Sequence, residues 1–259
     1  MINTNQTHPW LVVNSPAPTA RIRVICFPHA GGGSVPFHGW SRDLGQEFEV
    51  CSVLLPGRER RHREPVIERF DVLLDRIYEA VCTRLDRPLA LFGYSMGALL
   101  ALEVARRLRR DGLPLPVHLF VAARRAPHLP SWELPIHECS DETLLDETSR
   151  VYGEIAGVVR NDPELRSLFT RALRADYRVV ASYNFHVEPP LACPVTALGG
   201  ELDSMVDRAG LEAWSGYSGL RFSLYQFSGG HFFLHSHRSA LLSAVRRELS
   251  GALDVGANG

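Results

Sequence analysis

The stretch LALFGYSMGALLALEV, residues 89–104, decides the fold. It starts with a short apolar run, Leu89–Phe92, passes through Gly-Tyr-Ser-Met-Gly, and continues into residues that favour a helix. The pentapeptide fits the pattern Gly-x-Ser-x-Gly, in which a serine sits on a sharp turn between a strand and a helix. Small flanking residues permit the tight turn, and the helix dipole favours negative charge beside the serine. The pattern predicts that Ser95 is a nucleophile.

Apolar runs and helical patterns alternate on both sides of this stretch. Strands are expected at Ile22–Phe27, Glu49–Leu55, Leu89–Phe92, Val117–Ala123, Val195–Leu198 and Phe222–Phe227. Helices are expected at Phe70–Leu85, Ala98–Arg110 and Arg238–Leu249, and residues 1–20 are expected to form a polar arm. Alternation of this kind predicts a mostly parallel central sheet with helices on both faces. With the serine turn, it indicates an α/β-hydrolase fold in which residues 1–259 form a single domain.

The alternation is interrupted between Pro130 and Pro190, where the sequence shows helical patterns and no clear strand. A first helix has an apolar face that ends near Ile155, and a second opens at Pro163, directly behind Asn161-Asp162. We expect residues 130–190 to form a helical lid over the carboxyl edge of the sheet. The alternative is a helical excursion without a gating role.

Composition excludes several other classes of protein. The 259 residues carry a formal net charge of −1, which gives no general attraction to nucleic acid or to an anionic membrane. No run of 18 apolar residues and no signal peptide are found, so a cytoplasmic location without a membrane partner is expected. The cysteines are odd in number and widely spaced, which favours neither disulfides nor a metal site. They are Cys26, Cys51, Cys82, Cys139 and Cys193.

A serine nucleophile needs a base, and the base needs an orienting carboxylate, which in α/β hydrolases follow the serine in the order acid, then histidine. The segment GGELDSMVD after Val195–Leu198 offers three acids, Glu201, Asp203 and Asp207. The segment SGGHFFLHSH after Phe222–Phe227 offers three bases, His231, His235 and His237. Asp203 and His231 lie just past their strands and are the expected pair. Asp207 fits a surface or capping position, and the other two histidines could simply be solvated.

The transition state needs two backbone N–H groups for its oxyanion. One is expected from Met96, the residue after the nucleophile, and the other from Ala30 in the loop FPHAGGGS at 27–34. His29 lies in the same loop but precedes the acid in the chain. We therefore expect His29 to fix the loop rather than to act as a second base.

Six segments together resemble type II thioesterases, the free-standing editing enzymes of polyketide and nonribosomal peptide synthesis. They are FPHAGG at 27–32, LPGRE at 55–59, GYSMG at 93–97, YRVVASYNF at 177–185, GGELD at 199–203 and GGHFFL at 229–234. The resemblance implies that Ser95, Asp203 and His231 form the triad and that Ala30 and Met96 form the oxyanion hole. It also implies that the substrate is an acyl group on the phosphopantetheine arm of an acyl or peptidyl carrier protein. No cofactor or metal is implied, and we expect a monomer.

An arginine-rich run follows LPGRE and departs from what the family usually shows. Its basic residues Arg58, Arg60, Arg61 and Arg63 either dock an acidic carrier protein or form a solvated face. Other functions stay open as well. They are a medium-chain acyl-carrier-protein thioesterase of fatty-acid synthesis, a thioesterase domain excised from a synthase, a generic carboxylesterase, and a binding protein without activity. The last should have lost a triad member, whereas this chain has all three.

Overall fold

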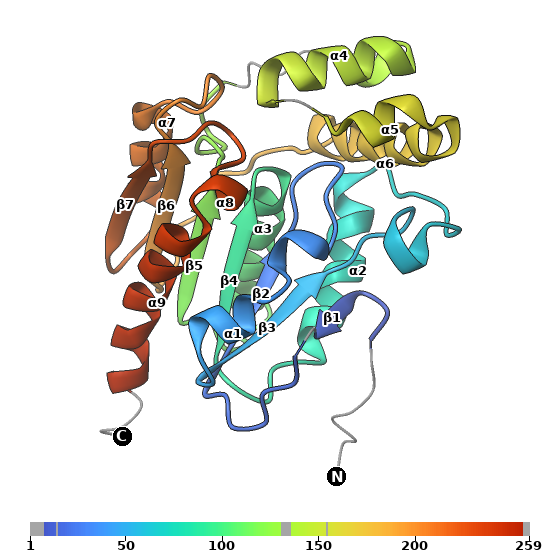
Figure 1. Ribbon diagram of the computed structural model, residues 1–259. Coiled ribbons are helices and arrows are strands. Elements are labelled where there is room, and N and C mark those ends of the chain that lie inside the picture. Colours follow the sequence, from blue (N-terminus) through green and yellow to red (C-terminus); the bar gives the residue numbers. More distant parts are fainter. Residues whose placement is uncertain (1–7, 14, 131–135, 154, 256–259) are drawn as a thin grey trace.

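The computed structural model describes residues 8–13, 15–130, 136–153 and 155–255, and its centre is a seven-stranded sheet (Figure 1). The strands are β1 (Leu11–Val13), β2 (Ile22–Phe27), β3 (Phe48–Val53), β4 (Leu89–Tyr94), β5 (His118–Ala122), β6 (Val195–Gly200) and β7 (Phe222–Phe227). Their order is β1-β3-β2-β4-β5-β6-β7, and every neighbouring pair is parallel except β1 with β3. The expected mostly parallel sheet is confirmed.

Helices cover both faces of the sheet, as the alternating pattern predicted. On one face lie α2 (Phe70–Cys82) and α3 (Met96–Arg110), and on the other lie α1 (Trp40–Leu44) and α9 (Arg238–Val255) (Figure 1). Successive residues of β4 alternate between the two layers, so that Leu91 packs toward α3 and Phe92 toward Trp40. A strand buried on both sides has no polar face, which is why the central strands read as continuous apolar runs.

The segment between β5 and β6 contains helices and no strand in its described residues. These are the 3₁₀ turn Ile136–Glu138, α4 (Asp141–Tyr152), α5 (Gly157–Asn161) and α6 (Pro163–Ala181). Asp162 caps α6 by accepting hydrogen bonds from the amides of Glu164 and Leu165, at 2.9 and 3.0 Å. Figure 1 shows α4, α5 and α6, the cover helices, lying across one end of the sheet. The two long helices were expected, whereas α5 was not.

The amino-terminal segment departs from the expectation of a polar arm. Residues Leu11–Val13 add an antiparallel edge strand to β3, with Leu11 paired to Val53 and its side chain buried. Three residues are too few to show an alternating pattern, so the sequence gives no strand signal here. Residues 1–7 and 14 of the expected arm lie outside the described part of the chain.

The remaining α-helices in the described residues are short and follow strands at the carboxyl edge. They are α7 (Arg208–Glu212) after β6 and α8 (Phe233–Ser236) after β7, and neither was expected. The expected helix to Leu85 ends instead at Cys82, where the Thr83 hydroxyl donates to the carbonyl of Ala80 at 2.7 Å. None of the described helices combines the length and apolarity needed to span a bilayer.

Candidate active site

Ser95 occupies a strained turn between β4 and α3. Its φ of 53° lies in the left-handed region, which non-glycine residues rarely adopt. A Cβ on Gly93 would lie 2.3 Å from the carbonyl oxygen of Gly97, and one on Gly97 would lie 2.2 Å from that of Phe27. Neither position can accept a side chain. The two glycines of the motif are thus required by close backbone packing.

Contacts at hydrogen-bonding distance join Ser95 to His231 and His231 to Asp203. The Ser95 hydroxyl is 3.3 Å from Nε2 of His231, and Nδ1 of His231 donates to Oδ2 of Asp203 at 2.7 Å. Because Nδ1 carries the proton, Nε2 presents a lone pair to the serine. His231 and Asp203 are both buried, which shields their interaction from water. The arrangement can draw a proton from the serine hydroxyl as it attacks an acyl carbon.

The glycines before the acid and the base let their two loops pack together. A Cβ on Gly200 would lie 2.2 Å from the carbonyl oxygen of Gly229. The amide of Leu202 donates to that same carbonyl at 3.0 Å. Asp203 is held in turn, since its Oδ1 accepts a hydrogen bond from the amide of Met205 at 3.0 Å. These contacts align the loop after β6 with the loop after β7.

The other candidate acids and histidines after β6 and β7 do not take part in these contacts. Asp207 caps α7, where its carboxylate accepts from the amide of Gly210 at 2.9 Å. Glu201 and His235 are exposed. His237 lies 3.0 Å from the hydroxyl of Ser228. Asp207 therefore occupies a capping position, one of the two positions expected for it from the sequence.

Ala30 and Met96 line a small cleft together with Ser95 and His231. His29 stands beneath this loop, where its Nδ1 donates to the carbonyl of Ala30 at 2.9 Å and its ring packs against Phe232. Burial lowers the pKa of His29 to about 4, so that its imidazole is neutral near pH 7. A neutral, packed histidine agrees with the loop-fixing role expected for it.

Arg58 departs from the prediction that it docks a partner. Its side chain is buried and forms a two-pronged ion pair with Asp176 of α6, at 2.6 and 2.9 Å, while also donating to the carbonyl of Gly32 at 2.8 Å. The next residue, Glu59, accepts hydrogen bonds from the amide and hydroxyl of Ser34 at 2.6 and 2.5 Å. The structural roles of Glu59 and Asp176 were not expected from the sequence.

Arg61 is also buried, so the docking prediction fails for two of the four arginines. Its guanidinium donates to the carbonyl of Leu54 at 2.8 Å, pairs with Glu64, and lies 4.2 Å from the centroid of the Trp10 ring. A buried guanidinium with these partners cannot meet another protein. Arg60 and Arg63 are exposed.

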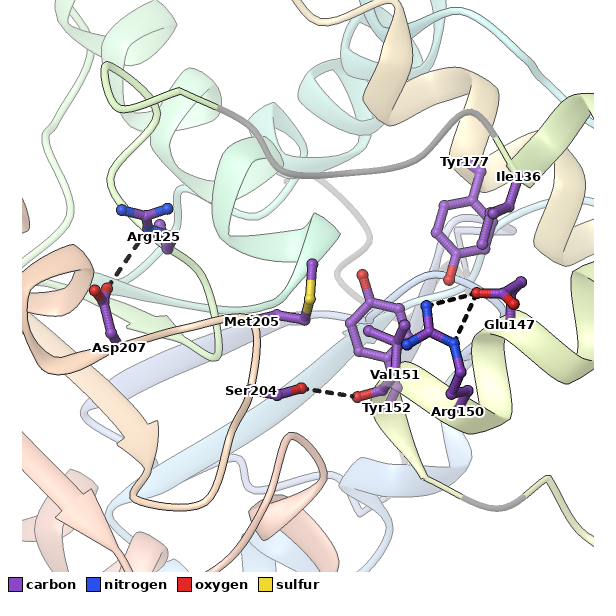
Figure 2. A pocket seen from close by; sticks show the side chains of 10 residues that line it. All are labelled: Arg125, Ile136, Glu147, Arg150, Val151, Tyr152, Tyr177, Ser204, Met205 and Asp207. Carbon is purple, nitrogen blue, oxygen red and sulfur yellow. Dashed lines mark hydrogen bonds and ion pairs between the residues drawn. The ribbon is translucent and has the colours of Figure 1, made fainter.

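Two cavities adjoin beneath the cover helices. One, of about 390 Å³, is lined by Ser95 and His231 and extends along apolar side chains that include Leu129, Val180 and Phe185. The other, of about 460 Å³, lies between α4 and the loop after β6, and is shown in Figure 2. Both are lined by Arg125, Tyr152, Tyr177 and Met205. In both cavities, apolar atoms make up more of the accessible lining than polar atoms do.

Metal ligands do not gather in the described part of the chain. No three His, Cys, Asp or Glu side chains there form a group that could hold a metal ion.

Comparison with known proteins gives a consistent result. The family model described as "Thioesterase domain" matches residues 22–249. Gramicidin S biosynthesis protein GrsT of Aneurinibacillus migulanus is 35% identical over 245 residues, 95% of each chain. The solved structure of BorB, the type II thioesterase of the borrelidin biosynthetic cluster, is 37% identical with a TM-score of 0.84, covering 94% of this chain and 100% of BorB. The human medium-chain S-acyl fatty acid synthase thioesterase is 33% identical, over 84% of this chain and 82% of its own length.

Proposed function

The chain belongs to the thioesterase family and is a thioester hydrolase, and we propose that it removes aberrant or stalled acyl groups from the phosphopantetheine arms of carrier proteins. The proposed setting is polyketide or nonribosomal peptide synthesis. The relatives named for gramicidin S and borrelidin biosynthesis support this setting. The enzyme is proposed to act as a cytoplasmic monomer.

The observation that carries the proposed chemistry is the chain of contacts from Asp203 through His231 to Ser95, in the wall of a mainly apolar cavity. Asp203 holds the imidazole with Nδ1 protonated and stabilises the imidazolium that forms during the reaction. The apolar cavity suits an acyl chain, because burying its methylene groups is favourable. The pair of cavities provides room for both the acyl group and the arm that carries it.

Acylation begins with attack by the Ser95 oxygen on the thioester carbonyl carbon, while the hydroxyl proton passes to Nε2 of His231. The carbonyl electron pair moves onto oxygen, and the N–H groups of Ala30 and Met96 are proposed to receive that oxyanion. Collapse of the intermediate breaks the carbon–sulfur bond. His231 then gives its proton to the sulfur, and the carrier leaves with a free thiol.

Deacylation repeats these steps with water. His231 accepts a proton from the water as its oxygen attacks the acyl-enzyme carbonyl. The second intermediate breaks the bond to the Ser95 oxygen and returns the proton to it. The products are a free carboxylic acid and the regenerated enzyme.

Residues 130–190 are proposed to act as a lid, in keeping with their helical pattern. Tyr152 of α4 and Tyr177 and Val180 of α6 line the cavity that contains Ser95. Movement of these helices would change access to the nucleophile. Residues 131–135 and 154 lie outside the described part of the chain.

An acidic carrier protein is proposed to dock beside Arg60 and Arg63. Arg171 of α6 adds a third exposed guanidinium to this surface, since its Nη2 donates to the carbonyl of His62 at 2.6 Å. In the described residues, none of these three arginines forms an ion pair within the chain. Positive charge without an internal partner suits a surface that attracts an acidic protein.

The proposed function is tested by hydrolysis rates across a panel of acyl groups, each presented on a carrier protein and on a small thiol. We expect higher kcat/KM on the carrier protein, with free carrier thiol as a product. A strong preference for medium-length fatty acyl groups on a fatty-acid carrier would favour the fatty-acid thioesterase instead. Faster cleavage of oxygen esters than of thioesters would indicate a general carboxylesterase.

A further inference from the structure

Asp176 is a buried acid on a cover helix, and its carboxylate reaches the loop that contains Ala30. Its side chain is 2% exposed, and Oδ2 accepts a hydrogen bond from the amide of Gly31 at 2.7 Å. Both carboxylate oxygens also accept from Arg58, whose side chain is 9% exposed. Arg58 in turn donates to the carbonyl of Gly32. One ion pair therefore binds two consecutive residues of the loop.

The loop is held in such a way that both peptide planes on either side of Ala30 are fixed. The first plane contains the Ala30 N–H and the His29 carbonyl, which accepts from the amide of Gly32 at 2.9 Å. The second contains the Ala30 carbonyl, which accepts from the His29 imidazole, and the Gly31 N–H, which donates to Asp176. Asp176, on a cover helix, thus holds the second of these peptide planes through a hydrogen bond.

Packing reinforces the hydrogen bond. Gly31 has a φ of +74°, and a Cβ at this position would lie 3.0 Å from Cδ1 of Leu173 and 3.4 Å from the ring of Phe169. Leu173 and Phe169 both belong to α6, as does Asp176. The backbone of the loop therefore lies directly against this helix, with the carboxylate at the point of contact.

A buried ion pair is an expensive way to hold a loop, because both charges lose their hydration. An apolar contact would pack the same surfaces, but it would not orient a peptide. A carboxylate that accepts from a backbone N–H makes a short, directional bond, and orientation is what an oxyanion donor requires.

We propose that Asp176 is a positioning residue for the oxyanion hole, which acts through Gly31 to hold the Ala30 amide toward the carbonyl oxygen of the substrate. Arg58 holds the carboxylate in place. The inference rests on the proposed roles of Ser95 and Ala30. The oxyanion hole then depends on α6, and this helix must keep its contact with the Ala30 loop during the reaction.

The test uses Asp176→Ala and Asp176→Asn in the full-length enzyme. Loss of a positioned oxyanion donor costs about 10²-fold or more in kcat, and we expect a loss of this order for Asp176→Ala with KM changed less than about threefold. Asp176→Asn keeps one acceptor for Gly31 and should lose less. If the alanine variant fails to fold, the asparagine variant and Arg58→Lys carry the test.

Glu49→Gln is the matched control, because Glu49 of β3 forms a buried ion pair with Arg23 of β2. It should lower thermal stability without lowering kcat. Loss of kcat in this control equal to that of the Asp176 variants would mean that buried charge pairs support only the general fold, and the inference would be wrong.

A second measurement separates positioning from structural damage. An alkyl trifluoromethyl ketone accepts the Ser95 oxygen at its carbonyl carbon, with the serine proton passing to His231, and forms a tetrahedral oxyanion. A thioether analogue of the substrate cannot react and reports ground-state binding alone. We expect the Asp176 variants to lose ketone affinity by the same factor as kcat, with thioether affinity unchanged. Equal losses for both compounds, or none for the ketone, would overturn the inference.

This measurement is independent of the proposed substrate. If the parent enzyme hydrolysed no carrier-bound thioester, the proposed function would fail. The ketone comparison would still decide the role of Asp176, because it requires only attack by Ser95.

Discussion

The ring of Tyr152 lies 4.5 Å from the imidazole of His231, centroid to centroid, and covers the proposed base. Tyr152 is the last residue of α4, and Figure 2 shows it facing the same cavity as Met205 and Tyr177. Helix α4 therefore contacts the imidazole of the proposed base directly. Displacing α4 would expose His231 to water, whereas seating it would exclude water from the reacting groups.

Unequal attachment of the cover helices predicts which of them opens. Asp176 and Arg178 of α6 form ion pairs with Arg58 and Glu68 of the core. The contact of α4 with the loop after β6 is a long hydrogen bond, in which the Ser204 hydroxyl donates to the carbonyl of Val151 at 3.4 Å. We expect amide hydrogen exchange in residues 141–161 to be at least tenfold faster than in α6 and in β4. Equal protection of α4 and α6 would contradict a lid that opens at α4.

Replacement of Ser95 by alanine should abolish acyl-enzyme formation. Removal of the nucleophile from a triad that acts as a unit costs about 10⁶-fold in kcat. The fold should persist, because alanine keeps the Cβ and removes only the hydroxyl. A fluorophosphonate probe should label the parent and leave Ser95→Ala unlabelled. Labelling of the variant would assign the nucleophile to another residue.

The two aspartates after β6 should respond differently to the same change. Asp203→Asn keeps the size of the side chain but favours the wrong tautomer of His231, which costs up to about 10⁴-fold in kcat. Asp207→Asn affects a helix cap and should cost about 1 kcal/mol of stability or less, with kcat nearly unchanged. Steady-state kinetics and thermal unfolding of both variants measure the difference. A larger kinetic loss at Asp207 would reverse the assignment.

Residues that follow strands at the carboxyl edge could be predicted from the sequence. Ser95 comes directly after a strand, and Asp203 and His231 come shortly after theirs. Parallel strands bring such positions to one edge of the sheet. The long helices could be predicted for a similar reason, since α6 carries both a helical apolar pattern and an Asp-Pro start. Local pattern and chain order were sufficient for these parts.

Partnerships between distant residues could not be predicted in the same way. Arg58 and Asp176 are 118 residues apart, and neither has a local pattern that indicates burial. An arginine in a charged run is usually exposed, so Arg58 was expected on the surface until the structure showed its acid partner. The segment YRVVASYNF, which resembles the thioesterase family, begins at Tyr177. The acid that pairs with Arg58 is Asp176, one residue before that segment.

Buried histidines should make stability fall in mild acid. Burial lowers the pKa of His118 to about 4 and that of His29 to about 4, whereas both have a pKa of about 6.5 in the unfolded chain. Between these values the unfolded state binds more protons, so the free energy of unfolding decreases as pH falls from 6.5 toward 4. Over this whole pH range, each histidine lowers the free energy of unfolding by roughly 3 kcal/mol.

Urea unfolding at pH 7.5 and pH 5 measures this loss. His118 lies at the start of β5, with Nε2 2.8 Å from the hydroxyl of Thr196, and is the cleaner of the two to replace. His118→Gln keeps a polar partner for Thr196 and cannot titrate. It should therefore show a smaller decrease in unfolding free energy than the parent. An unchanged decrease would mean that His118 does not contribute.

Charge reversal should show whether Arg60 and Arg63 guide a carrier protein to the site. Both are exposed, and among the described residues neither forms an ion pair, so their positive charge is available to a partner. Charges at the rim of an interface act mainly on association, and the Arg60→Glu, Arg63→Glu double variant should lose about tenfold in kcat/KM on acyl-carrier protein. Hydrolysis of a small acyl-cysteamine thioester should be unchanged.

A matched reversal at the exposed Arg246 and Arg247 of α9 should leave both reactions unchanged. Added salt should slow only the carrier reaction of the parent, since charges are screened beyond about 8 Å at physiological ionic strength. Equal losses on both substrates would instead show that this segment supports the site itself, and no loss on either would place docking elsewhere on the cover helices.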